Sequence, residues 1–168
     1  MGEPIVTALA LAVAAVAALT DLRTRRIPNV LTLPAAVAGL VLSAALGGPE
    51  GLWVSASGWA FGCALLLPLF LLRGLGAGDV KLVAALGALR GPEFVFFTCL
   101  WAGVVGGPMA LAGLLRSRRL GLALTHLYLF KFFPHPGGSF ITAGRIPYAP
   151  AIALGALATA GGARWIGG

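Results

Sequence analysis

The sequence predicts an all-α membrane protein of about six transmembrane helices, with a glycine-rich break before the fourth. Of its 168 residues, 59% are hydrophobic and 10% are charged, whereas soluble domains average about 45–50% apolar. The apolar residues form long runs, separated by short clusters rich in arginine, glycine and proline. Because these clusters are too short to fold alone, residues 1–168 are expected to form a single integral-membrane domain.

The first two apolar runs match the length of a membrane-crossing helix. A bilayer core of about 30 Å needs about 20 helical residues, and Pro4–Thr20 and Val30–Leu46 come close to that length. Glu3 precedes the first run and an arginine cluster follows it, the reverse of the charge order in a signal peptide. We therefore expect the first run to remain as a span. In the loop between the two runs, Pro28 is expected either to end the first helix or to begin a new one.

The next two runs flank the glycine-rich stretch. Leu52–Leu72 is expected to form a third span, after the turn-forming cluster Gly47–Gly51. Val80–Leu89 is too short to cross a membrane alone. We expect the fourth span to include Leu75–Asp79 as partly irregular backbone, which is tolerated at membrane depth where protein or a wet cavity surrounds it.

The last part of the chain supplies two further spans. Phe94–Leu115 is a clear apolar run, and its glycines favour close helix contacts. Leu120–Gly144 mixes aromatic, basic and proline residues, and we interpret it as a surface-lying or re-entrant segment. Pro147–Ala163 is expected to complete a sixth span.

The basic residues predict the orientation of these spans. With both termini on the outer side of the membrane, ten of the 12 lysines and arginines lie on the cytoplasmic side, and Arg90 and Arg164 are the exceptions. This distribution satisfies the positive-inside rule for an inner-membrane protein. The net charge of +7 is therefore interpreted as a topology signal and as contacts with anionic lipids, not as a nucleic-acid surface.

Two aspartates are the candidate functional residues. Glu3, Glu50 and Glu93 fall outside, so Asp21 and Asp79 are the only carboxylates on the cytoplasmic side, each where an inner loop meets a span. Acids at such positions are functional candidates by default. Asp79 also follows three alternating glycines, which leave space for another group to approach it. These glycines are Gly74, Gly76 and Gly78.

A pair of carboxylates predicts acid–base chemistry. Two carboxylates held close together cannot both ionise cheaply, so they share one proton. The ionised group can then accept a proton from water while the neutral group donates to a carbonyl oxygen, as in peptide hydrolysis. Asp79 opens a helix and Asp21 closes one, so the helix dipoles favour an ionised Asp79 and a protonated Asp21.

Three motifs carry a resemblance to a known family. They are the sequence DLRTRRIPN from Asp21, the sequence GLGAGDVKL around Asp79, and Arg145–Pro150. Together they resemble the type IV prepilin peptidases, membrane aspartic proteases of the GxGD class. The resemblance implies that Asp21 and Asp79 are the catalytic pair, supported by the loop that contains Gly74, Gly76, Gly78 and Lys81. It also implies that type IV prepilin or pseudopilin precursors, used in pilus assembly and protein secretion, lose a basic leader at the cytoplasmic face.

The sequence departs from the long members of this family in one respect. Those members carry a cysteine-containing cytoplasmic insertion and also methylate the new N-terminus, whereas here only Asp21–Asn29 joins the first two spans. The chain thus resembles the short, peptidase-only form associated with tight-adherence pili. Cys63 and Cys99 lie in apolar runs without zinc-site spacing, so we expect no disulfide, metal or cofactor.

Other interpretations of the same residues stay open. Asp21 alone could pair with Arg25, and Asp79 alone could be a helix N-cap. A proton- or cation-coupled transporter would also place carboxylates beside glycine-broken helices. A non-catalytic assembly subunit would tolerate loss of both acids. Cleavage of a co-expressed prepilin by Asp21→Asn and Asp79→Asn variants separates these possibilities.

Overall fold

The computed structural model describes residues 3–71, 75–116 and 148–166, and all the secondary structure in these ranges is helical. The helices are α1 (Glu3–Thr24), α2 (Asn29–Leu71), α3 (Ala77–Arg116) and α5 (Ala149–Ile166). By length and composition, α1, α2 and α3 can each cross a membrane, and α5 contains a shorter apolar helix. The surface-lying segment predicted at Leu120–Gly144 and the residue Gly74 lie outside the described ranges.

The two longest helices are bent back on themselves. A straight helix of 43 residues would measure about 65 Å, twice the thickness of a bilayer core. In α2, Gly48 has a φ of 60°, a value that glycine adopts easily, and the positions of Gly51 and Ser43 are in contact across this bend. The bend coincides with the predicted turn cluster. The predicted second and third spans therefore fall on two arms of α2.

A second bend divides α3. Gly91 has a φ of 82°, and a Cβ atom built on Gly87 would meet the side chain of Val95 on the other side of the bend. The predicted fourth and fifth spans fall on the two arms of this helix. The glycine-rich break before α3 is described only from Leu75 onward, so the full break stays a prediction.

The first arm of α3 forms the centre of the molecule. Leu82, Val83 and Leu86 are each 0% exposed, and small residues of α1 and α5 complete the same core. Both arms of α2 pack on this arm through glycine: Gly58 faces Gly87 so closely that neither position has room for a side chain. Small residues allow helices to approach in this way. The central arm is therefore enclosed by its neighbours.

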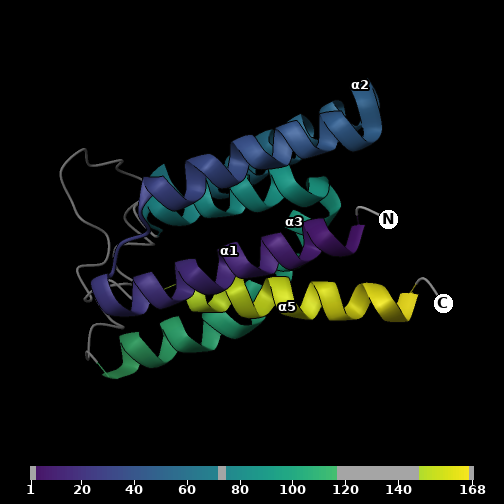
Figure 1. The fold of residues 1–168 in the computed structure, drawn as a ribbon. Coiled ribbons are helices and arrows are strands. Elements are labelled where there is room, and N and C mark those ends of the chain that lie inside the picture. Colours follow the sequence, from purple (N-terminus) through teal and green to yellow (C-terminus); the bar gives the residue numbers. More distant parts are fainter. Residues whose placement is uncertain (1–2, 72–74, 117–147, 167–168) are drawn as a thin grey trace.

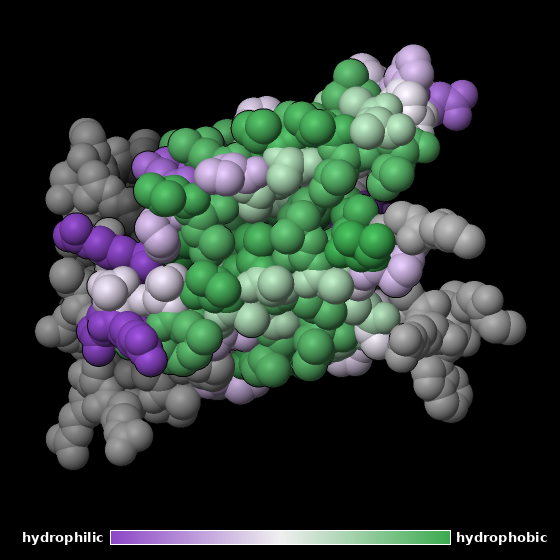
Figure 2. All heavy atoms as spheres, in the orientation of Figure 1, coloured by the Kyte–Doolittle hydropathy of each residue, from purple (hydrophilic) through white to green (hydrophobic). Residues whose placement is uncertain are grey.

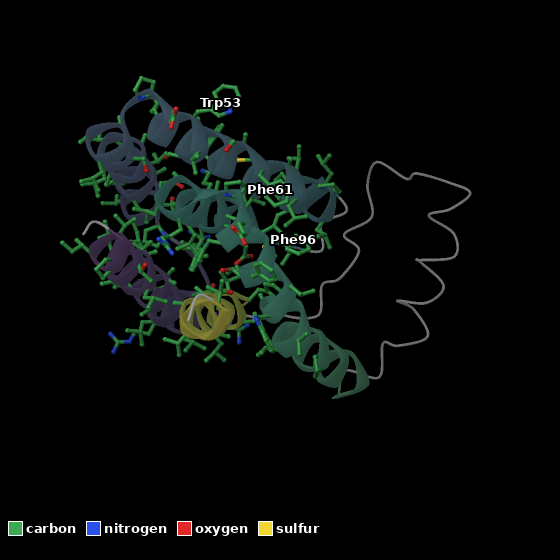
Figure 3. All side chains as sticks on the ribbon, turned by 90° about the vertical axis from the view of Figure 1, so that its right-hand side faces the viewer. Trp53, Phe61 and Phe96 are labelled. Carbon is green, nitrogen blue, oxygen red and sulfur yellow. The ribbon has the colours of Figure 1, made fainter. Side chains whose placement is uncertain are left out.

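Large apolar side chains point outward from α2 and α3. Trp53 is 76% exposed and Phe96 is 50% exposed, and Figure 3 shows Trp53 directed away from the helices. Figure 2 shows apolar residues across the middle of one face and hydrophilic residues gathered mainly at its left-hand end and at the tip of the α2 bend. This is the distribution expected of a surface in contact with lipid.

Five segments of the chain lie together at one end of the molecule. α1 ends there, and the short connector Arg25–Pro28 leads into α2 at the same end. Contacts between Asn29 and Lys81 and between Asp21 and Ala149 place the beginnings of α3 and α5 beside them. Figure 1 shows that α1 begins and α5 finishes at the opposite end. The two predicted catalytic residues, Asp21 and Asp79, both lie in the end where these segments meet.

Candidate active site

Asp21 and Asp79 are buried at the same end of the molecule. Asp21 lies in the last turn of α1 and is 7% exposed, and Asp79 lies in the first turn of α3 and is 9% exposed. Buried carboxylates require hydrogen-bonding partners, because burial without them is costly. The partners of each aspartate define how the site is constructed.

Asp79 is held by the loop that precedes it. The amide of Gly76 donates a hydrogen bond to Oδ2 of Asp79 at 3.1 Å, and the carbonyl of Gly76 accepts one from the Asp79 amide, also at 3.1 Å. Asp79 is the third residue of α3, so it is not the N-cap residue itself; its carboxylate reaches back to the amide of Gly76, which precedes the helix. A Cβ atom on Gly76 would lie 3.2 Å from the same carboxylate oxygen. Gly76 therefore borders the carboxylate directly.

The connector between α1 and α2 packs on the same loop. A Cβ atom on Gly78 would lie 3.0 Å from Cβ of Ile27. At the start of the connector, Arg25 has a φ of 53°. Its amide donates a hydrogen bond to the carbonyl of Asp21 at 2.8 Å, and α1 ends there. The motif that begins at Asp21 therefore folds onto the motif that contains Asp79.

Asp21 is bound by the beginning of α5. The amide of Ala149 donates to Oδ2 of Asp21 at 3.2 Å, across 128 positions of sequence. The first amides of a helix have no partner within the helix, so this donor is available. The end of α1 is in this way joined to the stretch before the last helix. Arg145, Ile146 and Pro147 of that stretch lie outside the described residues.

Tyr148 lies next to the residue whose amide binds Asp21. It directly precedes Ala149, its hydroxyl donates to the carbonyl of Ala102 at 3.4 Å, and its ring lies against Gly106. Burial raises the pKa of its phenol, and the charges of Cys99 and Asp79 raise this pKa further. Tyr148 and Ala149 belong to the motif Arg145–Pro150, and the sequence predicted no role for either residue. Their position at the start of the last apolar run, Pro147–Ala163, was the available signal.

Lys81 joins two helices beside the site. Its Nζ donates to Oδ1 of Asn29 at 3.0 Å, which connects the first turn of α3 to the first residue of α2. The side chain is exposed. Of the predicted supporting residues, Gly76 contacts the Asp79 carboxylate, Gly78 contacts the connector and Lys81 bridges the helices, and their role in catalysis stays a prediction.

The helix dipoles do not distinguish the two aspartates as the sequence predicted. That expectation placed Asp79 at a helix N-terminus and Asp21 only at a helix C-terminus. In the structure Asp21 also accepts an amide from the N-terminus of α5, which favours a negative charge. Each aspartate therefore accepts an amide hydrogen bond at the beginning of a helix, Asp79 at α3 and Asp21 at α5.

The described residues contain no group of three or more histidine, cysteine, aspartate or glutamate side chains that could hold a metal ion. Cys63 and Cys99 are free thiols. Only four residues separate α1, which ends at Thr24, from α2, which begins at Asn29. This leaves no space there for an inserted cytoplasmic domain.

The fold and the site define a class of protein: a helical membrane protein with two buried carboxylates at one end. The model of the type IV leader peptidase family matches residues 8–111, which include both aspartates and the loop between α2 and α3. The chain belongs to the type IV leader peptidase family, in its short, peptidase-only form. Neither the search of curated proteins nor that of solved structures gave a match. The family of the chain and its apolar helices together indicate an inner-membrane peptidase.

Proposed function

We propose that this protein is an aspartic endopeptidase that removes the basic leader from type IV prepilin or pseudopilin precursors. One observation carries the proposal. The two aspartates of the chain are both buried at one end of the molecule, and the amide of Ala149 binds Asp21 there. Membership in the leader peptidase family supports the substrate class. A helix cap alone would explain Asp79 but would not require a second buried aspartate, Asp21, at the same end of the molecule.

In the proposed reaction the two carboxylates share one proton. The ionised carboxylate takes a proton from water, and the water oxygen bonds to the carbon of the scissile carbonyl. The protonated carboxyl gives its proton to the carbonyl oxygen, which forms a neutral tetrahedral intermediate. The carboxyl that took the water proton then protonates the peptide nitrogen, and the carbon–nitrogen bond breaks. The other carboxylate takes a hydroxyl proton from the intermediate as the new carboxyl group forms, which restores the pair with one shared proton. No cofactor takes part in this scheme.

We further propose that the chain crosses the membrane six times with both termini outside, and that the aspartates face the cytoplasm. The two arms of α2, the two arms of α3, and the helices α1 and α5 supply the six spans. α1 begins and α5 finishes at the same end of the molecule, as an even number of spans requires (Figure 1). The exposed side chains of Arg23, Arg25 and Arg26 lie at the aspartate end, which supports a cytoplasmic position and contact with anionic lipids.

The test uses purified protein in detergent and a synthetic prepilin with a basic leader and an apolar stem. Wild-type protein is expected to release the leader at one site, identified by mass spectrometry of the new N-terminus. Asp21→Asn and Asp79→Asn should each reduce cleavage by a factor of about 10⁴ or more, because each removes one of two groups that act together.

Glu50→Gln is the matched control. Glu50 is an exposed carboxylate in the α2 bend, so its loss should leave cleavage unchanged. Thermal unfolding in the same detergent checks that all three variants fold. Cleavage by either aspartate variant at the wild-type rate would exclude the proposed mechanism. Ion-coupled uptake into vesicles, with no cleavage, would favour a transporter.

A further inference from the structure

We propose that Tyr148 is a positioning residue: its ring, seated on Gly106, fixes where α5 begins and so directs the amide of Ala149 at Asp21. This inference rests on the proposed function and extends it to a residue outside the aspartate pair. It assigns Tyr148 no direct contact with the substrate. Tyr148 would act by holding one carboxylate in place relative to the other.

The ring of Tyr148 packs closely against the second arm of α3. A Cβ atom on Gly106 would lie 2.5 Å from Cε2, 2.8 Å from Cζ and 2.9 Å from the hydroxyl oxygen of Tyr148. The hydroxyl donates to the carbonyl of Ala102, which lies one turn earlier on the same face of the helix. Only a glycine at position 106 therefore allows the ring to occupy this place.

The backbone of Tyr148 transmits the position of the ring to Asp21. Its carbonyl accepts the amides of Ala151 at 3.0 Å and Ile152 at 3.2 Å, so Tyr148 is the capping residue of α5. The next amide, that of Ala149, is 3.2 Å from Oδ2 of Asp21. Because ring, cap and amide belong to adjacent residues, a shift of the ring should change the hydrogen bond to Asp21.

The same residue lies near the second carboxylate. The Asp79 charge contributes to the raised pKa of the Tyr148 phenol, after burial and Cys99. The phenol therefore stays neutral at physiological pH and is not a competing base. The charge of Asp79 thus acts on the Tyr148 phenol, while the amide of the next residue binds Asp21. This arrangement relates the two aspartates through a single dipeptide.

The decisive variant is Gly106→Ala, and Gly103→Ala is its matched control. Both glycines lie on the second arm of α3, but a Cβ atom on Gly103 meets nothing within 4 Å. Both changes have the same effect on helix propensity, so they differ only in displacement of the Tyr148 ring. Gly106→Ala is expected to lower kcat by about 10-fold or more with little change in KM, because small misplacements of reacting groups are costly. Gly103→Ala should cleave like the wild type.

A second readout does not require activity. The chain has only two aspartates, so in an Asp79→Asn background carbon-13 labelling of aspartate carboxyls reports Asp21 alone. Adding Gly106→Ala should shift the infrared carboxyl band of Asp21, and adding Gly103→Ala should leave it in place. If wild-type protein cleaves no precursor, the proposed function fails, while this spectrum still tests the position of Tyr148.

Substitutions of Tyr148 complete the test. Tyr148→Phe keeps the ring and should retain most of the turnover, whereas Tyr148→Leu should lower kcat as Gly106→Ala does. In the Tyr148→Leu background, Gly106→Ala should have little further effect, because the clashing ring is gone. The inference is overturned if Gly106→Ala changes neither kcat nor the Asp21 band. It is equally overturned if Gly106→Ala lowers kcat in the Tyr148→Leu background as much as it does in the wild type.

Discussion

The carboxylate of Asp79 has two tasks in the proposed enzyme. Its Oδ2 accepts the amide of Gly76 and so caps α3, and the same group is proposed to exchange protons with water. A cap fixes the position of a side chain by a backbone hydrogen bond. A catalytic carboxylate needs such a fixed position, so the structural interpretation and the functional one are compatible at this residue.

Titration of Tyr148 tests its environment at the residue scale. The chain has two tyrosines, so in a Tyr128→Phe variant the ultraviolet absorbance of tyrosinate reports Tyr148 alone. Its pKa should lie above the usual value of 10.0, chiefly because of burial. Asp79→Asn removes one of the two smaller causes of the raised pKa, so it should lower the pKa of Tyr148 only part of the way toward 10.0. A pKa at or below 10.0 would contradict the described position of the phenol.

The raised pKa has a consequence for stability. The folded protein holds the phenolic proton more tightly than the unfolded chain does, so this contribution is fully present below the unfolded pKa. It is lost as the pH rises through the folded pKa. The Tyr128→Phe variant should therefore become less stable above about pH 10, as measured by thermal unfolding. Its stability should fall more steeply with pH than that of the double variant Tyr128→Phe, Tyr148→Phe.

Gly78 provides a second test at this scale. A side chain there would meet Ile27, so Gly78→Val should destabilise the protein by about 1–3 kcal/mol through overpacking. Combining it with Ile27→Ala should recover part of this loss, because the opposing side chain is then shorter. Thermal unfolding in detergent measures both. Equal stability of the single and double variants would show that Ile27 is not the neighbour that matters.

At the scale of elements, glycine allows the two arms of α2 and the first arm of α3 to pack at close range. Gly58 meets the backbone of Gly87 and Gly91, and Gly62 meets that of Val83 and Ala84. Inside a membrane, close packing replaces the hydrophobic effect as the source of helix association. The buried arm of α3, which carries Asp79 at its start, is positioned by these contacts.

Gly58→Ala should therefore weaken this packing. The new methyl group would meet backbone atoms of α3, which cannot move aside as a flexible side chain could. The free energy of unfolding is therefore expected to fall by about 1–3 kcal/mol. Gly161→Ala in α5 is the control, since a Cβ atom there meets nothing within 4 Å. Unfolding in detergent compares the two. A Gly58→Ala variant as stable as Gly161→Ala would contradict the described packing.

At the scale of the whole molecule, the charge at its two ends predicts its orientation in the membrane. Exposed arginines lie at the aspartate end, and the exposed side chain of Glu50 lies in the α2 bend. The positive end is expected to remain in the cytoplasm, where the precursors are made. The proposed site then faces the compartment that supplies its substrate.

Cysteine labelling in whole cells tests this orientation. In a background without Cys63 and Cys99, the single change Glu50→Cys should react with a membrane-impermeant thiol reagent. The single change Arg26→Cys should react only after the membrane is permeabilised. Both side chains are exposed, so accessibility differs only by the side of the membrane. The opposite pattern of labelling would reverse the proposed topology.

The amino-acid sequence by itself determined the helical, membrane-compatible class, the two aspartates and the family resemblance. These features are local, because apolar runs, charge clusters and short motifs can be recognised within a few dozen residues. Only the tertiary structure decided that the Ala149 amide binds Asp21, that Ile27 packs on Gly78 and that Tyr148 rests on Gly106. These contacts join segments far apart in sequence, and they exist only once the helices have packed and brought their ends together.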